Sequence, residues 1–210
     1  MEPVPRRRGP VSKFTARLRK AERKRQLLTQ AKQLFVTLGY QHTTTEKIAQ
    51  AAGVTEPVLY QHFPSKKALF IEVLQDIRKA TLHRWDDQTA GIVNPVEKLH
   101  AVVDLFLGSA RERILEFRVM HRTLVEIDDS EIAACLRDFY LESEAFLAKI
   151  LGECQEAGVF RKDLDPRVGA WEFIRTALGY TLTLPLEIPL YQDETYQQKA
   201  IGCLLRGMLA

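Results

Sequence analysis

The chain has no long uncharged hydrophobic run. A membrane-spanning helix needs about twenty apolar residues in succession, whereas the stretch Ala177–Leu186 reaches ten residues and is followed by Glu187. The N-terminus is basic at residues 6–8, but no apolar block follows it, so no secretory signal is expected. The sequence therefore predicts a cytoplasmic protein without a membrane partner.

Cysteine is scarce, and the motifs of common enzyme chemistry are missing. The three cysteines, Cys135, Cys154 and Cys203, are odd in number and far apart. This argues against a disulfide framework or a zinc knuckle and fits reduced, buried thiols. No glycine-rich phosphate loop and no G-x-S-x-G motif occurs. Glu97 and His100 have the E-x-x-H spacing of a helical metal site, but a matching pair is missing. We therefore expect no enzyme activity, no metal and no cofactor.

Charge is distributed unevenly along the chain. The formal net charge of +3 is the balance of two opposite halves. Residues 1–80 carry sixteen Lys/Arg and six Asp/Glu, whereas residues 81–210 carry fourteen Lys/Arg and twenty-one Asp/Glu. The basic front is therefore expected to bind a polyanion. The alternative is a helical scaffold or ligand-binding module whose basic face meets another acidic partner.

Apolar residues recur every three or four positions, and no useful period-two pattern of strands is present. Gly39, Gly53 and Gly158 are typical of helix ends, and Asp165-Pro166 is typical of a helix start. The spacing predicts helices at residues 17–38, 45–52, 56–63, 66–87, 95–110, 117–127, 130–157, 166–184 and 194–209. The predicted fold class is therefore all-α, with about nine helices.

Residues 45–64 predict a helix-turn-helix motif. Gly53 supplies the unusual backbone angles of a tight turn, and Ala49 is small where the second helix must cross closely. Thr43 and Glu46 have the spacing of a capping box at the start of the first helix. A helix of this size fits the DNA major groove. A motif of this kind can also be an ordinary helical corner, but the surrounding positive charge favours DNA binding.

A dense series of residues between positions 20 and 75 has a recognisable pattern. It comprises Leu34-Phe35, Gly39-Tyr40, Thr43-Thr44-Thr45, Ile48-Ala49, Ala52-Gly53-Val54, Leu59-Tyr60, His62-Phe63, Ser65-Lys66 and Leu69-Phe70. In these residues the chain resembles the DNA-binding domain of TetR-family transcriptional regulators. The remaining two-thirds resemble that family only in the number, length and order of the helices.

The resemblance implies a homodimeric, ligand-responsive regulator, most often a repressor, on a palindromic double-stranded DNA operator. A DNA-binding domain would span residues 20–75, and a ligand-binding and dimerisation domain would span residues 76–210. The matched positions imply phosphate contacts from Thr45, Thr55, Tyr60, His62 and Lys66. Thr55 would alternatively cap the recognition helix, and Gln61 would reach a phosphate or an adenine edge.

Two features depart from the usual pattern of that family. Glu56-Pro57 stands where small or basic residues are common. Glu56 either accepts a hydrogen bond from a cytosine amino group or only stabilises the helix N-terminus, and Pro57 would touch a thymine methyl group. The second feature is a basic flexible arm at residues 1–19, which either enters a minor groove or remains a solvated tail. Its leading basic residues are Arg6, Arg7 and Arg8.

The helix predicted at residues 166–184 is apolar nearly all round, which indicates burial on both sides. In the family that the chain resembles, the last two helices pair with those of a second copy. The predicted interface residues are Ile174, Leu178, Ile201, Leu204, Leu205 and Met208. A core formed within one chain is the alternative.

The helices between residues 95 and 184 also predict a pocket for an unidentified small apolar or amphipathic effector. Its predicted apolar lining comprises Phe106, Met120, Phe139, Phe146, Trp171 and Tyr180, and its polar lining comprises Arg118, His121, Arg122 and Arg175. Each aromatic residue alone is also typical of an ordinary core. The arginines would suit an acidic ligand such as a fatty acid or an acyl thioester.

Overall fold

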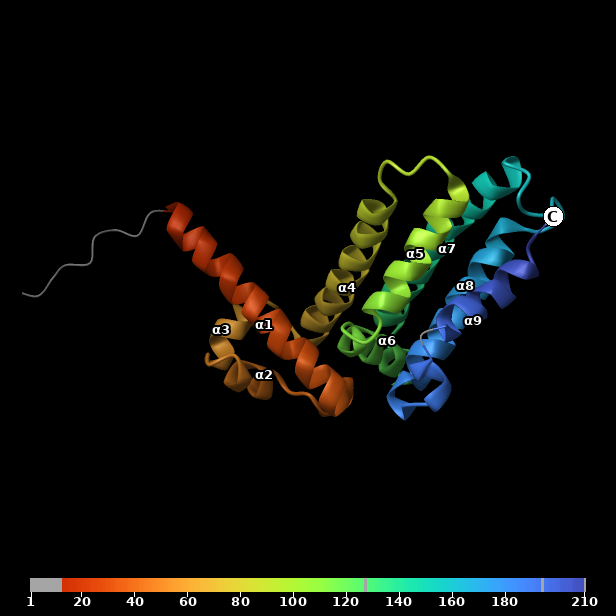
Figure 1. Ribbon diagram of the computed structural model, residues 1–210. Coiled ribbons are helices and arrows are strands. Elements are labelled where there is room, and N and C mark those ends of the chain that lie inside the picture. Colours follow the sequence, from red (N-terminus) through yellow and green to blue (C-terminus); the bar gives the residue numbers. More distant parts are fainter. Residues whose placement is uncertain (1–12, 127, 194, 210) are drawn as a thin grey trace, which may run out of the picture. The chain divides into compact units, whose positions relative to one another are not determined.

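The computed structural model describes residues 13–126, 128–193 and 195–209, without the side chains of residues 13–19, 126, 192, 197 and 198. Within these ranges the chain forms nine α-helices, and its only β-type pairing is an isolated bridge between Phe160 and Leu209 (Figure 1). The prediction of an all-α fold with about nine helices is therefore confirmed. Contacts divide the chain into two compact units, Met1–Phe70 and Ile71–Ala210, whose boundary falls inside a helix.

The first unit contains three helices and the beginning of a fourth. These are α1 (Lys13–His42), α2 (Thr45–Ala51), α3 (Glu56–Tyr60) and α4 (Lys66–Thr89). The path of α1 is interrupted at Gly39, whose φ of +81° favours glycine, so the sequence-based helix end at residue 38 marks a real break. Helix α2 packs against both α1 and α3.

The cap of α2 differs from the sequence-based expectation. Thr44, not Thr43, is the N-cap, and its hydroxyl accepts a hydrogen bond from the Lys47 backbone N–H at 3.2 Å. Thr43 is fully buried, and its hydroxyl donates to the Gly39 carbonyl at 2.7 Å. The Thr43 side chain is buried against the end of α1, and Thr44 directly precedes α2, so the cap lies one residue later than predicted.

A compact apolar core fixes the first unit. Leu27, Ala31 and Phe35 of α1 are buried at the spacing of one helix face. The Phe35 ring meets the Phe70 ring edge-on at 4.6 Å between centroids, and Tyr40 lies 4.8 Å from Phe70. These aromatic contacts tie the end of α1 to the beginning of α4.

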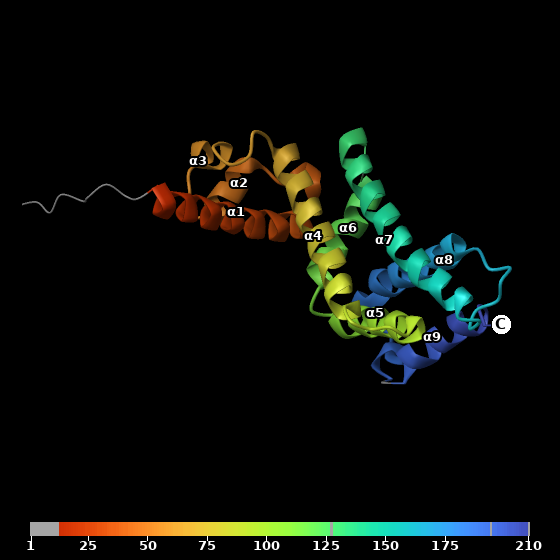
Figure 2. The ribbon, with the colours of Figure 1, turned by 90° about the horizontal axis from the view of Figure 1, so that it is seen from above.

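The second unit contains the remainder of α4 and five further α-helices. These are α5 (Pro95–Ser109), α6 (Ile114–Glu126), α7 (Ser130–Glu156), α8 (Pro166–Thr183) and α9 (Tyr196–Arg206), with short 3-10 turns at Leu184–Leu186 and Pro189–Gln192. Helix α7 packs against α5, α6 and α8, as the view in Figure 2 shows for α7 and α8. Asn94, Asp129 and Asp165 cap α5, α7 and α8 by accepting hydrogen bonds from backbone N–H groups.

Two of the three cysteines lie in the core of this unit. Cys135 and Cys154 are buried free thiols, and burial raises the pKa of Cys154 to about 11. Cys203 is exposed, so the expectation of burial is wrong for this residue, which lies on the outer side of α9. No described helix is long and apolar enough to span a membrane, and no three His, Cys, Asp or Glu residues gather as a metal site within the described ranges.

Candidate DNA interface and ligand cavity

The turn between α2 and α3 has the geometry of a helix-turn-helix motif. Gly53 has φ of +64°, and the following Val54 N–H donates to the Ala49 carbonyl at 2.9 Å. Ile48 and Leu59 are fully buried beneath the crossing, while Ala49 is 2% exposed. A larger side chain at Ala49 would separate the helices, so small size at this position lets α3 cross closely.

Three of the predicted DNA contacts bind one another in the DNA-free chain. The Thr45 hydroxyl, at the start of α2, donates to the Glu56 carboxylate at the start of α3. The Tyr60 hydroxyl lies 3.2 Å from the Thr45 hydroxyl oxygen. Because Thr45 has one proton and gives it to Glu56, Tyr60 must be the donor in this second contact. The hydroxyl protons of Thr45 and Tyr60 are therefore both engaged inside the motif.

The remaining predicted contacts on α3 and its ends face solvent. Thr55 precedes the helix and Pro57 lies in its first turn, where the missing N–H is harmless. The Thr55 side chain makes no capping hydrogen bond. Thr55 is thus the N-cap residue of α3 by its backbone, and its exposed hydroxyl remains available. Gln61 follows α3 and is also exposed.

His62 is partly buried at the end of the motif. Burial lowers the pKa of His62 below its ordinary value, and the positive charges of Lys20, Lys24 and Arg23 lower it further. Its Nδ1 atom is buried and has no hydrogen-bond partner among the described residues. At neutral pH this imidazole is therefore uncharged, and it would meet a phosphate as a neutral donor unless the phosphate raises its pKa.

Lys66 has a role within the fold that the sequence did not indicate. Its ammonium group donates to the Tyr40 carbonyl at 2.8 Å and lies 4.4 Å from the centre of the Tyr40 ring. Partial burial lowers the pKa of Lys66. A lysine that satisfies a carbonyl at the end of α1 is held in place, and a contact with DNA would have to share this ammonium group. The predicted arm residues Arg6, Arg7 and Arg8 lie outside the described residues.

A cavity of about 120 Å³ lies in the second unit, between α4, α5, α6, α7 and α8. Its lining is mostly aliphatic and aromatic, with six polar residues. The apolar residues are Ile77, Trp85, Val102, Val103, Phe106, Phe117, Met120, Phe139, Tyr140, Leu147, Phe173, Ile174, Ala177 and Leu178. The polar residues are Thr81, Arg113, Glu116, His121, Ser143 and Thr181. Four residues predicted for a pocket, Phe106, Met120, Phe139 and His121, are thus brought together.

The other predicted pocket residues do not line this cavity, and here the structure differs from the prediction made from the sequence. Arg118 is exposed on α6, and Arg122, which is half-buried on the same helix, is also outside the lining. Tyr180 lies by a separate cleft with Phe106, 6.3 Å from its ring.

Trp171 and Arg175 border a shallow surface depression on α8, not the cavity. The Trp171 indole N–H donates to the Glu144 carboxylate at 2.8 Å, and Arg175 pairs with Glu172 one turn away. These polar partners hold both side chains on the outer side of α8.

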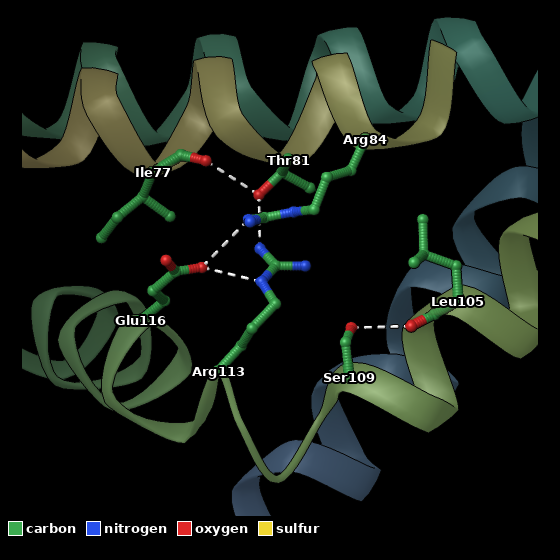
Figure 3. Close-up of polar contacts among 7 residues, drawn as sticks. All are labelled: Ile77, Thr81, Arg84, Leu105, Ser109, Arg113 and Glu116. Carbon is green, nitrogen blue, oxygen red and sulfur yellow. Dashed lines mark hydrogen bonds and ion pairs between the residues drawn. The ribbon is translucent and has the colours of Figure 1, made fainter. Parts of the chain in front are cut away.

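The cavity contains an arginine that the sequence did not reveal. Arg113, just before α6, is 9% exposed and donates from Nε to Glu116 at 2.8 Å and from Nη2 to Thr81 at 2.7 Å. Arg84 of α4 reaches the same Glu116 oxygen at 3.3 Å (Figure 3). Arg113 precedes the regular spacing of α6, so periodicity alone could not place it inside. Burial lowers the pKa of Arg113, and its hydrogen bond with Glu116 opposes this shift.

The other polar groups of the cavity are largely turned towards their own helices. Thr81, Ser143 and Thr181 each donate to a carbonyl one turn earlier, at 2.8 Å. Because the Thr181 proton is used in this way, His121 Nε2 must donate across the 3.1 Å contact to the Thr181 oxygen. Burial lowers the pKa of His121, which keeps the imidazole neutral at pH 7.

The predicted dimer residues fall into two groups. Ile174 and Met208 are buried inside the single chain, and Leu178 lines the cavity together with Ile174. Ile174 and Met208 therefore have no exposed surface for a partner, whereas Leu178 is half-buried and its place in an interface stays a prediction. Ile201, Leu204 and Leu205 of α9 are half-buried against the same core. Exposed apolar residues on α8 are instead Val168 and Leu182.

The fold and the motif together define a helix-turn-helix DNA-binding regulator with a helical second unit. A family profile described as "Bacterial regulatory proteins, tetR family" matches residues 27–73. The HTH-type transcriptional regulator TcmR of Streptomyces glaucescens is 32% identical over 157 residues, which cover 72% of this chain and 68% of TcmR. The chain belongs to the tetR family, whose members are transcription regulators and not enzymes.

Two further similarities differ in their extent. The HTH-type transcriptional activator FasR of Mycolicibacterium smegmatis is 51% identical over 59 residues, but this match covers only 28% of this chain and 27% of FasR. The structure of the ketosteroid transcriptional regulator KstR2 of Mycobacterium tuberculosis superposes with a TM-score of 0.67. At 23% identity, with 96% of this chain and 98% of KstR2 covered, it supports the fold.

Proposed function

We propose that this protein is a ligand-responsive repressor that binds a palindromic DNA operator as a homodimer in the cytoplasm. The helix-turn-helix motif carries this proposal, because α3 presents Thr55, Pro57, Tyr60 and Gln61 at its exposed face and ends. The basic residues of the first 80 positions would supply the salt-dependent part of the affinity. The family favours repression over activation, although relatives of both kinds exist: KstR2 is named a repressor and FasR an activator.

Dimerisation would use α8 and α9. Val168 and Leu182 are 53% and 62% exposed on α8, and they flank Arg175 and Gly179 on the exposed side of that helix. Residues spaced by three or four positions form one stripe along a helix, so a second copy could cover this stripe by two-fold symmetry. The symmetry of such a dimer would require two half-sites in the operator.

The cavity in the second unit would bind the effector. Helix α4 lines the cavity with Ile77, Thr81 and Trp85, and the same continuous helix begins in the DNA-binding unit. A ligand that prefers one position of α4 would therefore bias the spacing of the two recognition helices. A switch from 1:99 to 99:1 would require a preference of about 5.5 kcal/mol.

An electrophoretic mobility shift assay with the DNA upstream of the gene for this chain tests the proposed function. We expect saturable binding that weakens steeply with salt, with protein bound as a dimer in analytical ultracentrifugation. Scrambled DNA of the same composition should bind at least about a hundredfold more weakly. A lack of binding at low salt to any upstream fragment would contradict the proposed regulator function. Binding by a monomer would contradict the proposed homodimer.

A further inference from the structure

At one end of the cavity lining Arg113 pairs with Glu116, and Arg84, which lies outside the lining, adds a second guanidinium group to this pair. Two guanidinium groups, from Arg113 and Arg84, share one carboxylate, because both approach Oε2 of Glu116. Arg113 and Glu116 are the only charged residues in the described lining, since His121 is neutral. Tyr140 is neutral as well, because burial raises its pKa to about 12. The three-residue cluster therefore carries a net charge of +1.

This cluster also has unused hydrogen-bond donors. Nε of Arg113 binds Glu116 and Nη2 binds Thr81, but Nη1 makes no hydrogen bond with any described residue. Figure 3 shows this third nitrogen pointing away from Glu116. Nε of Arg84 is buried and also has no partner among the described residues. Nε of Arg84 is a buried donor without an acceptor, which is destabilising, whereas Nη1 of Arg113 is not fully buried and can accept a second anion as partner.

The rest of the cavity lining is apolar or uncharged. Phe106, Phe117, Met120 and Phe139 surround the space, and the hydroxyl groups of Ser143 and Thr181 already bind carbonyls of their own helices. The volume of about 120 Å³ is close to that of an engineered cavity of about 150 Å³ that accepts benzene. An apolar group of about this size therefore fits without a large rearrangement.

We propose that the effector is an amphipathic monocarboxylate whose carboxylate binds Arg113 and whose apolar tail occupies the aromatic part of the cavity. This inference rests on the proposed function, because it assigns the chemical class of the effector to the same site. A carboxylate supplies the acceptors that Nη1 of Arg113 lacks, and its charge balances the cluster. An amine would face the Arg113 guanidinium group, and a neutral amide would leave the three-residue cluster at +1.

The contact also gives the ligand a direct effect on α4. Arg113 is bonded to Thr81 of α4, and Arg84 of the same helix competes for Glu116. A carboxylate on Arg113 draws this guanidinium group away from Thr81 or Glu116. The hydrogen bonds between α4 and the start of α6 then change with occupancy of the cavity.

Three probes with one apolar body test the ligand class: 4-phenylbutyrate, 4-phenylbutanamide and 4-phenylbutylamine. Binding to the full chain is measured by calorimetry and by the shift in melting temperature. We expect the carboxylate to bind at least tenfold more tightly than the amide or the amine. Hexanoate and decanoate, each with its amide, extend the series in length. The proposal is wrong if no carboxylate binds more tightly than its own amide.

Variants locate the contact. Arg113→Met should remove the preference for carboxylate over amide, whereas the matched Arg118→Met, on the exposed side of α6, should keep it. Glu116→Gln removes the competing carboxylate and should tighten 4-phenylbutyrate at least threefold. If Arg113→Met does not fold, the affinity of Glu116→Gln for 4-phenylbutyrate still tests whether the carboxylate binds at Arg113. A preference that survives in Arg113→Met, or weaker binding in Glu116→Gln, would overturn the assignment.

The two proposals can fail separately. Protein that shifts upstream DNA but shows no carboxylate preference refutes only the ligand class. Protein that prefers the carboxylate but never binds DNA keeps the ligand class and refutes the regulator.

Discussion

The Thr45 hydroxyl donates its proton to the carboxylate of Glu56, so two residues expected to contact DNA are bonded to each other in its absence. The Glu56 carboxylate thus accepts the Thr45 proton that, by the family resemblance, a DNA phosphate would accept. Tyr60 extends the same chain of hydrogen bonds by donating to Thr45. This hydrogen bond suggests a role for Glu56 besides the predicted base contact and stabilisation of the helix N-terminus: we propose that it competes with the DNA backbone for Thr45.

Replacement of Glu56 by Gln should strengthen DNA binding. The change removes a negative charge that repels phosphate and leaves Thr45 with a weaker, neutral acceptor for its proton. We expect the affinity to rise about three- to tenfold on operator and on non-specific DNA alike, as measured by fluorescence anisotropy at low salt. If Glu56 reads a cytosine instead, Gln should lower operator affinity and alter the preferred sequence in a selection assay.

Two control variants separate the hydrogen bond from the charge. Glu46→Gln removes a negative charge from the exposed first turn of α2, where Glu46 makes no described hydrogen bond to Thr45. Its effect on affinity should be smaller than that of Glu56→Gln. The double variant Thr45→Val with Glu56→Gln should lose part of the gain in DNA affinity. Equal gains in affinity from Glu46→Gln and Glu56→Gln would show that only the removed charge matters.

Binding of DNA should be coupled to protonation of His62. In the free chain, burial and the neighbouring Lys20, Lys24 and Arg23 depress the pKa of His62, so the ring is neutral at pH 7. An adjacent phosphate would raise that pKa, and the complex would then bind a proton that the free protein lacks. Affinity should therefore increase as the pH falls from 8, and level off below the depressed pKa of the free chain. A gain of about three- to tenfold corresponds to a pKa difference of about half to one unit.

His62→Gln should remove this pH dependence. His42→Gln is the matched control, since His42 is an exposed histidine at the end of α1 in the same unit. A pH profile that is unchanged in His62→Gln would show that His62 does not meet a phosphate.

The local parts of the motif could be predicted from sequence, because short-range rules determine them. Gly53 is needed for a backbone with positive φ, and Ala49 for close crossing, and neither depends on distant residues. The cap at Thr44 was missed by one position, because the Thr43 side chain is buried against the end of α1. The place of Thr43 depends on how the end of α1 turns, which spacing does not reveal.

The cavity could be predicted only in outline. The aromatic residues on the faces of α5, α6 and α7 indicated a pocket, but which arginine enters it depends on the packing of several helices. Arg113 precedes α6 and is drawn in by Thr81 and Glu116, whereas Arg118 faces solvent. Likewise, α8 is apolar on two sides, and only the tertiary contacts show that Ile174 faces the cavity.

Deletion of residues 1–12 should weaken DNA binding and its dependence on salt. This segment contains Arg6, Arg7 and Arg8, and each arginine that neutralises a phosphate adds about 0.9 to the slope of log affinity against log salt. Helix α1 begins at Lys13, so the deletion leaves the described fold intact. A triple alanine variant at the three arginines should reproduce the loss. Unchanged affinity and slope would show that the arm does not contribute.

Substitution of Val168 and Leu182 by Asp should dissociate the dimer. Both side chains are exposed on α8, and an aspartate pair buried in a symmetric interface would leave four uncompensated charges per dimer. We expect the dimer dissociation constant, measured by analytical ultracentrifugation, to rise at least about a hundredfold. The stability of the single chain should change little, because neither residue is buried within it. Operator affinity should fall in parallel, since each half-site would then be bound by a separate molecule. Val125→Asp is the matched control, because Val125 is 86% exposed on α6, away from the proposed interface. A double variant that stays dimeric would place the interface elsewhere.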